Sequence, residues 1–140
     1  MADAAWKALE RKVAKMLGGQ RIAASGTGAI KGDVQHPIYH IECKWGKQIP
    51  KTVLKWHEQL KSIPFYHLEF YEYEVPKTIL NWYNKAKQQS EDKLPLLIMK
   101  PKGIHEEFVF WEVEQRLYVF TTLKAFAKDH QKTIWKVEVE

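Results

Sequence analysis

The chain has 140 residues, enough for one domain, and its 45% hydrophobic and 28% charged residues exclude disorder as the main state. A single cysteine excludes a disulfide framework and a cysteine-rich zinc site, and it favours a reducing, cytoplasmic compartment. The sequence has no long apolar run and no signal-like start, so no membrane contact is expected. The net charge of +5 favours a polyanionic partner such as nucleic acid.

The first half of the chain is expected to form one helix and a small sheet. Apolar residues recur at helical spacing over residues 6–17, and the two glycines that follow can end this helix. One side of the helix carries the basic row Lys7, Arg11 and Lys15. The expected order is a helix (6–17), a short strand (21–24), a glycine-rich loop (25–32), a second short strand (33–34) and a longer strand (38–45).

The second half begins with a hidden repeat. Residues 49–57 recur in similar form as residues 75–83, and each copy opens with a proline suited to a first helical turn, so two similar helices are expected. The connector, residues 63–74, mixes aromatic residues with glutamates and is expected to be extended. Farther on, the pattern predicts a buried strand (94–99), a hairpin (108–113 and 116–120), a short helix (121–129) and a final strand (133–139). This order predicts an α/β fold around one mixed sheet.

Carboxylates gather around the longer strand of the first half. Glu42 and Lys44 lie two residues apart and share one face, whereas Cys43 faces the other way, as expected of a small buried hydrophobic residue. Antiparallel pairing across the preceding turn brings Asp33 beside Glu42. Two carboxylates form an oxygen-only site suited to Mg²⁺ or Mn²⁺, to which Glu10 can add a ligand directly or through water. Lys44 can orient a water and stabilise charge on a phosphate.

A known family shows the same pattern. A Glu-x-Lys pair alone is most often an exposed strand face, but here Gly-Asp-Val (32–34) precedes Ile-Glu-Cys-Lys (41–44), which resembles the PD-(D/E)xK nuclease superfamily. With Glu-Arg (10–11) on the first helix and Ser-Gly (25–26) in the loop, the sequence resembles the archaeal-type Holliday junction resolvases and their phage relatives. This resemblance covers residues 7–47. It implies a restriction-endonuclease-like mixed sheet flanked by helices.

Two features depart from that family. Gly32 stands where the superfamily usually has a proline before the aspartate. Residues 47–75 or so, which hold one copy of the repeated helix and the aromatic connector, are longer than the family needs. We treat this stretch as an insertion or helix duplication within a single domain of residues 1–140.

The resemblance also implies roles for individual residues. By this resemblance, Glu10, Asp33 and Glu42 correspond to the acidic metal-site positions, and Lys44 corresponds to the catalytic lysine. The backbone carbonyl of Cys43 would face the metal, and Ser25 corresponds to a serine that contacts the substrate. The implied reaction is phosphodiester hydrolysis with Mg²⁺, or Mn²⁺ as a substitute. Expected DNA contacts are Lys7, Arg11, Lys15, Ser25, Lys31, Lys47 and Lys51.

The function expected from these features is structure-selective, Mg²⁺-dependent cleavage of four-way (Holliday) junctions by paired cuts. Two equivalent sites are needed to cut opposing strands, so a homodimer with twofold symmetry is expected. The enzyme would act in the cytoplasm, or in the host cytoplasm if a phage encodes it. Two alternatives stay open: another PD-(D/E)xK nuclease with a nicking, repair or flap-cutting role, and a non-catalytic DNA-binding module of the same fold.

Two groups of residues carry no assigned chemistry. The six histidines show no zinc-binding spacing and are expected to be surface or core groups. The aromatic residues of the connector are too many for a solvated loop. They are expected to be covered by the chain's own core, by a second subunit or by unstacked bases. Of the last two, the subunit interface is favoured, because the neighbouring glutamates repel phosphates.

Overall fold

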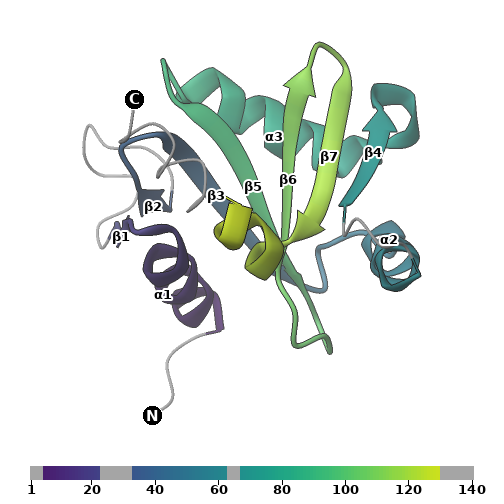
Figure 1. The fold of residues 1–140 in the computed structure, drawn as a ribbon, viewed down its shortest axis with the longest axis horizontal. Helices are drawn as coiled ribbons and strands as arrows, with labels where there is room; N and C mark the ends of the chain where they lie inside the picture. The colour runs from purple at the N-terminus through teal and green to yellow at the C-terminus, as the bar shows by residue number, and fades with distance from the viewer. Residues whose placement is uncertain (1–4, 23–32, 63–66, 130–140) are drawn as a thin grey trace.

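The computed structural model describes residues 5–22, 33–62 and 67–129, which form one mixed sheet with helices on both faces (Figure 1). The seven strands follow the order β1-β2-β3-β5-β6-β7-β4. The elements are α1 (Ala5–Leu17), β1 (Gln20–Arg21), β2 (Val34–Gln35), β3 (Tyr39–Gly46), α2 (Thr52–Lys61), β4 (His67–Tyr71), the 3₁₀ turn η1 (Glu72–Glu74), α3 (Lys77–Gln89), β5 (Leu94–Pro101), β6 (Phe108–Glu114) and β7 (Leu117–Thr122). A further helix, residues 123–129, follows β7. The predicted α/β fold is confirmed.

The sheet separates two hydrophobic cores, because successive side chains of the buried strand β5 point to opposite faces. Leu97 and Met99 belong to the core that α2 and α3 cover, whereas Leu96 and Ile98 belong to the core that α1 and residues 123–129 cover. All four side chains are fully buried. Elements on both faces therefore reach the neighbouring strand β3, which carries the candidate site.

β3 lies between neighbours of opposite direction. It pairs antiparallel with β2 and parallel with β5, and the parallel pairing requires the long crossover that α2, β4 and α3 supply. Within this crossover the chain visits the far edge of the sheet, where β4 pairs with β7. β2 is short and pairs with His40 and Ile41 only. Among the described residues, the second half of β3 therefore has no strand along this edge.

The repeated segments form α2 and α3, as predicted. The equivalent residues Val53 and Ile79 are fully buried in the same core. The two repeated tryptophans differ, because Trp56 is buried whereas Trp82 is only partly covered at the margin of that core. The extended connector is confirmed for β4, but the strand ends at Tyr71 and the chain then forms the turn η1.

Glycines fix the position of α1. Gly18 ends the helix with a φ of +80° and donates its N–H to the Ala14 carbonyl at 2.9 Å. Gly19 permits a close approach, since a Cβ at this residue would lie 2.5 Å from the Gln35 carbonyl oxygen. The end of α1 therefore packs directly on β2, next to Asp33.

Some expected boundaries shift. The first strand occupies residues 20–21, and the helix after β7 begins at residue 123, because Thr121 and Thr122 still pair with β6. The expected glycine-rich loop, residues 25–32, and the final strand, residues 133–139, lie outside the described residues. Of the helices that the structure describes, none has the length and apolar character of a membrane span.

Candidate active site

Asp33 is held at the junction of β2 and β3 by its backbone and its side chain. Its N–H donates to the Ile41 carbonyl at 2.9 Å, and its Oδ2 accepts a hydrogen bond from the Cys43 N–H at 2.7 Å. The register places Val34 opposite Ile41, so the next pair along is Asp33 and Glu42. The structure thus brings these two carboxylates together, as the sequence predicted.

The opposite pKa shifts of the two carboxyl groups indicate that they share a proton below about pH 7. Burial raises the pKa of Asp33 to about 7, and the charges of Glu42 and Glu10 act in the same direction, against the hydrogen bond from Cys43. Burial also opposes the charge of Glu42, but contact with His40 and the hydrogen bond from protonated Asp33 lower the pKa of Glu42 below its usual value. Below about pH 7, Asp33 therefore holds the proton and Glu42 the charge.

α1 brings a third carboxylate to the pair. Glu10 is 6% exposed, and its Oε1 lies 2.8 Å from Nε of Arg21 on β1. Burial raises the pKa of Glu10, Arg21 opposes this shift, and the charge of Glu42 adds to it. Glu10, Asp33 and Glu42 thus interact electrostatically, as expected of one site. Arg21 was not singled out from the sequence, although a cation is needed where three carboxylates are buried together.

Lys44 lies on the same face of β3 as Glu42, as the strand alternation predicted. Its charge favours the ionised form of Glu42. Its Nζ lies 5.4 Å from the centre of the Trp82 ring on α3. A cation over an indole face is attracted to it, so the second copy of the repeated helix helps to position this lysine.

His40 is the residue at this site that sequence reasoning missed. It was expected to be a surface or core group and is buried at 6% exposed, but its contact with Glu42, 3.3 Å between Nε2 and Oε1, was not expected. This nitrogen makes no conventional hydrogen bond within the described residues. The available signal was the spacing, since His40, Glu42 and Lys44 alternate along one strand and so share a face.

Cys43 contributes its backbone rather than its thiol. Its N–H points to the open edge of β3, where Asp33 accepts it. The N–H and C=O of a strand residue point to the same edge, so the Cys43 carbonyl also faces the carboxylates. Burial, followed by the charges of Asp33 and Glu10, raises the pKa of the thiol well above its usual value. The side chain packs against the α1 core, as expected of a small hydrophobic residue.

The donor set suits a hard divalent cation. In the described part of the chain, no group of three or more histidine, cysteine, aspartate or glutamate side chains is arranged to hold a metal ion by itself. Mg²⁺ usually needs only one or two protein carboxylates, together with waters and substrate phosphates. Asp33 and Glu42 supply these, and a cation there would replace the shared proton. Glu10, engaged by Arg21, is placed to act through water.

The expected DNA-binding residues lie on three segments. Lys7, Arg11 and Lys15 all belong to α1, so their helical spacing is confirmed. Lys47 and Lys51 are exposed in the segment after β3. Ser25 and Lys31 lie outside the described residues.

Comparison with known proteins gives no assignment. No protein-family model matches the chain, and neither a curated protein nor a solved structure matches it. Function is therefore inferred from the carboxylates, the lysine and their surroundings.

Proposed function

We propose that the protein is a metal-dependent DNA endonuclease of the PD-(D/E)xK type that resolves four-way junctions by paired phosphodiester hydrolysis. The observation that supports this most is the placement of Asp33 beside Glu42, on the strand that also carries Lys44. Burying two carboxylates together is unfavourable, because their like charges lie in a low-dielectric surrounding. A divalent cation relieves this cost, and a DNA phosphate can then approach.

Each residue has a distinct part in the proposed reaction. Asp33 and Glu42 would hold Mg²⁺ through side-chain oxygens, and Cys43 through its carbonyl. When bound, Mg²⁺ supplies Lewis-acid polarisation of the phosphate and lowers the pKa of the attacking water. Lys44 orients that water and stabilises the extra negative charge that develops as the new P–O bond forms and the old one breaks.

The neighbouring residues position these groups. His40 Nε2 lies 3.3 Å from one oxygen of Glu42, and the Cys43 N–H donates to one oxygen of Asp33. The remaining oxygens are left for the cation. Arg21 keeps Glu10 close to the site without adding net negative charge. This arrangement disfavours a DNA-binding module without activity, since binding alone gains nothing from carboxylates beside phosphates.

The rest of the proposal concerns how a junction is resolved. Two opposing strands must be cut, so we propose a homodimer with one site in each subunit. The positive charge of α1 and of the segment after β3 would hold the DNA arms. The single cysteine fits action in the cytoplasm.

A cleavage assay tests this function. The protein is incubated with matched four-way, flap, Y-shaped and linear duplex substrates, in Mg²⁺ and in EDTA. Paired cuts in the four-way junction in Mg²⁺ alone are expected, with little cutting of the linear duplex. Preference for a flap or Y-shaped substrate would instead identify another nuclease of the same type. Binding without cutting under every condition would contradict an enzymatic function.

A further inference from the structure

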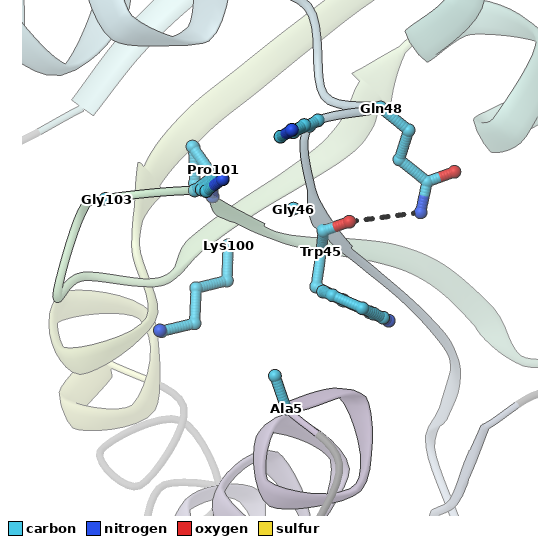
Figure 2. A pocket seen from close by; sticks show the side chains of 9 residues that line it. Ala5, Trp45, Gly46, Gln48, Lys100, Pro101 and Gly103 are labelled. Carbon is cyan, nitrogen blue, oxygen red and sulfur yellow. Dashed lines mark hydrogen bonds between the residues drawn. The ribbon is translucent and has the colours of Figure 1, made fainter.

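A hollow of about 540 Å³ opens where β3 and β5 end, beside the start of α1 at Ala5 (Figure 2). Trp45 and Lys100 are paired residues of the two parallel strands. In Figure 2 both side chains extend from the strands toward Ala5. Lys47 and Lys102 also line the hollow. An aromatic ring and three lysines therefore surround one space.

Trp45 is unusually open for a large apolar side chain in a strand. It is 39% exposed near the end of β3, where β5 pairs with the strand on one side only among the described residues. Its backbone is held in place, since Gln48 Nε2 donates to the Trp45 carbonyl at 3.1 Å and the next residue, Gly46, turns the chain with a φ of +84°. The ring is thus presented on a fixed backbone rather than on a loose loop.

The charge around the hollow is of one sign. The described residues that line it include three lysines and no carboxylate. Two other hollows are different: the one beside Tyr73 includes Glu72, and the one beside His57 includes two glutamates. An anionic ligand with a flat apolar group matches both the lysines and the exposed indole.

The hollow is also close to the candidate site. Trp45 is two residues beyond Cys43 on the same face of β3, roughly 7 Å along the strand, whereas Glu42 and Lys44 lie on the opposite face. The Cys43 backbone is in direct contact with Asp33. Among the described residues the edge of β3 between these two faces carries no strand beyond Ile41, so a nucleic-acid strand that passes around this edge from the carboxylates would bring a neighbouring nucleotide to the indole.

We propose that this hollow binds an unpaired nucleotide of the DNA substrate, with its base stacked on Trp45 and its flanking phosphates near Lys47, Lys100 and Lys102. The proposal rests on the proposed nuclease function and adds a substrate feature to it, an unstacked base next to the cut. Aromatic platforms beside basic side chains bind single strands in this way with little sequence preference. Base pairs in a duplex keep their faces covered, so the hollow would favour branched or open DNA over linear duplex.

Equilibrium binding in EDTA tests the proposal without cleavage. The probes are a short single-stranded oligonucleotide carrying the fluorescent base 2-aminopurine and a linear duplex of the same length. Trp45→Ala is expected to weaken single-strand binding by roughly 5- to 150-fold, the range of one base–aromatic stack, and to change duplex binding less than about twofold. Trp45→Phe is expected to keep most of the affinity, and quenching of 2-aminopurine should depend on Trp45.

Matched variants separate stacking from charge and from folding. Val113→Ala trims an apolar side chain that is 47% exposed on β6 and should leave binding unchanged. Lys100→Ala and Lys102→Ala should each reduce the salt dependence of single-strand binding by about 0.7 in log–log slope. Lys85→Ala, at an exposed position of α3, should not. Circular dichroism checks that each variant is folded.

The outcomes distinguish this inference from the proposed function. If the wild-type protein cuts junctions and the Trp45→Ala variant binds single strands as tightly as wild type, the inference is overturned and the proposed nuclease function stands. Equal losses on single strand and duplex would also overturn it, because stacking is specific to open bases. A wild-type protein that neither binds nor cuts DNA would overturn both.

Discussion

Asp33 accepts a hydrogen bond from the backbone N–H of Cys43, with 2.7 Å between Oδ2 and N. Asp33 directly precedes β2, and this contact links it to the part of β3 beyond the residues that pair with β2. One carboxylate is therefore placed by the backbone of the strand that carries the other. Because backbone positions in a sheet are rigid, the distance between the two acids is fixed before any cation binds. We attribute the shared proton of Asp33 and Glu42 to this imposed proximity.

The stability of the metal-free protein should fall as pH rises from about 4 to about 7. The pKa of Asp33 is about 7 in the folded protein and 3.8 in an ordinary aspartate, so the folded state keeps a proton that the unfolded chain releases. This contribution to stability is complete below about pH 4 and is lost as pH rises through about 7. Tm measured in EDTA at several pH values, for wild type and Asp33→Asn, isolates it by difference.

Asp33→Asn is a suitable reference because its side-chain oxygen can still accept the Cys43 N–H. The variant should be more stable than wild type at pH 8 and should show a smaller difference at pH 4. Mg²⁺ should raise the Tm of wild type more at pH 8 than at pH 5, since at low pH it competes with the proton. Superimposable pH profiles for the two proteins would argue against the shared proton.

DNA affinity should depend steeply on salt. The cations that flank the site, Lys7, Arg11 and Lys15 on α1 and Lys47 and Lys51 after β3, would release counterions on contacting phosphates. Each contact with duplex DNA contributes about −0.9 to the log–log slope. Binding to a four-way junction, measured in EDTA over a range of salt, should give a slope of several units, which the double variant Lys7→Ala/Lys15→Ala reduces. A slope that corresponds to one phosphate contact or fewer would show that these cations do not bind DNA.

The aromatic connector divides between core and surface, and this changes how the dimer is tested. Phe70 is buried and stacks on Trp56 with 4.2 Å between ring centres, so its loss would destabilise the fold. Tyr71 and Tyr73 are 58% and 86% exposed and stack on one another at the end of edge strand β4. They are therefore the connector residues available to a second subunit.

Tyr71→Ala/Tyr73→Ala should yield a folded monomer by light scattering. Such a monomer should nick four-way junctions singly instead of making paired cuts, because one site then acts at a time. Tyr71→Phe/Tyr73→Phe keeps the stacked rings and should remain dimeric. If the alanine variant is still dimeric and makes paired cuts, the subunit interface lies elsewhere.

Strand alternation and the pairing of near neighbours made the centre of the site predictable from the sequence. Asp33 beside Glu42, and Lys44 on the same face, needed only the period of a strand and one tight turn. The contacts between distant segments could not be predicted in this way. The ion pair between Arg21 and Glu10 depends on how α1 packs over the first strands. The contact between Lys44 and the Trp82 ring depends on where the crossover returns to the sheet.

Two further differences have local causes. Trp56 and Trp82 are equivalent in the repeat, but only Trp56 faces the aromatic residues of β4 and β6, so the repeat did not predict their different burial. His40 follows the same alternation as Glu42. Its contact with Glu42 was not predicted, because histidine spacing indicates zinc ligands more directly than it indicates a partner for a carboxylate.

The central claim is that Asp33, Glu42 and Lys44 form the site of metal-dependent phosphodiester hydrolysis, and cleavage of a four-way junction in Mg²⁺ by Glu42→Gln tests it most directly. This change keeps the shape of the side chain and removes the charge that would hold the cation. We expect a loss of about 10²-fold or more in cleavage rate, with folding and junction binding retained, and similar losses for Asp33→Asn and Lys44→Ala. Lys85→Ala should cut normally. Cleavage by Glu42→Gln at the wild-type rate, under the same Mg²⁺ dependence, would contradict the claim.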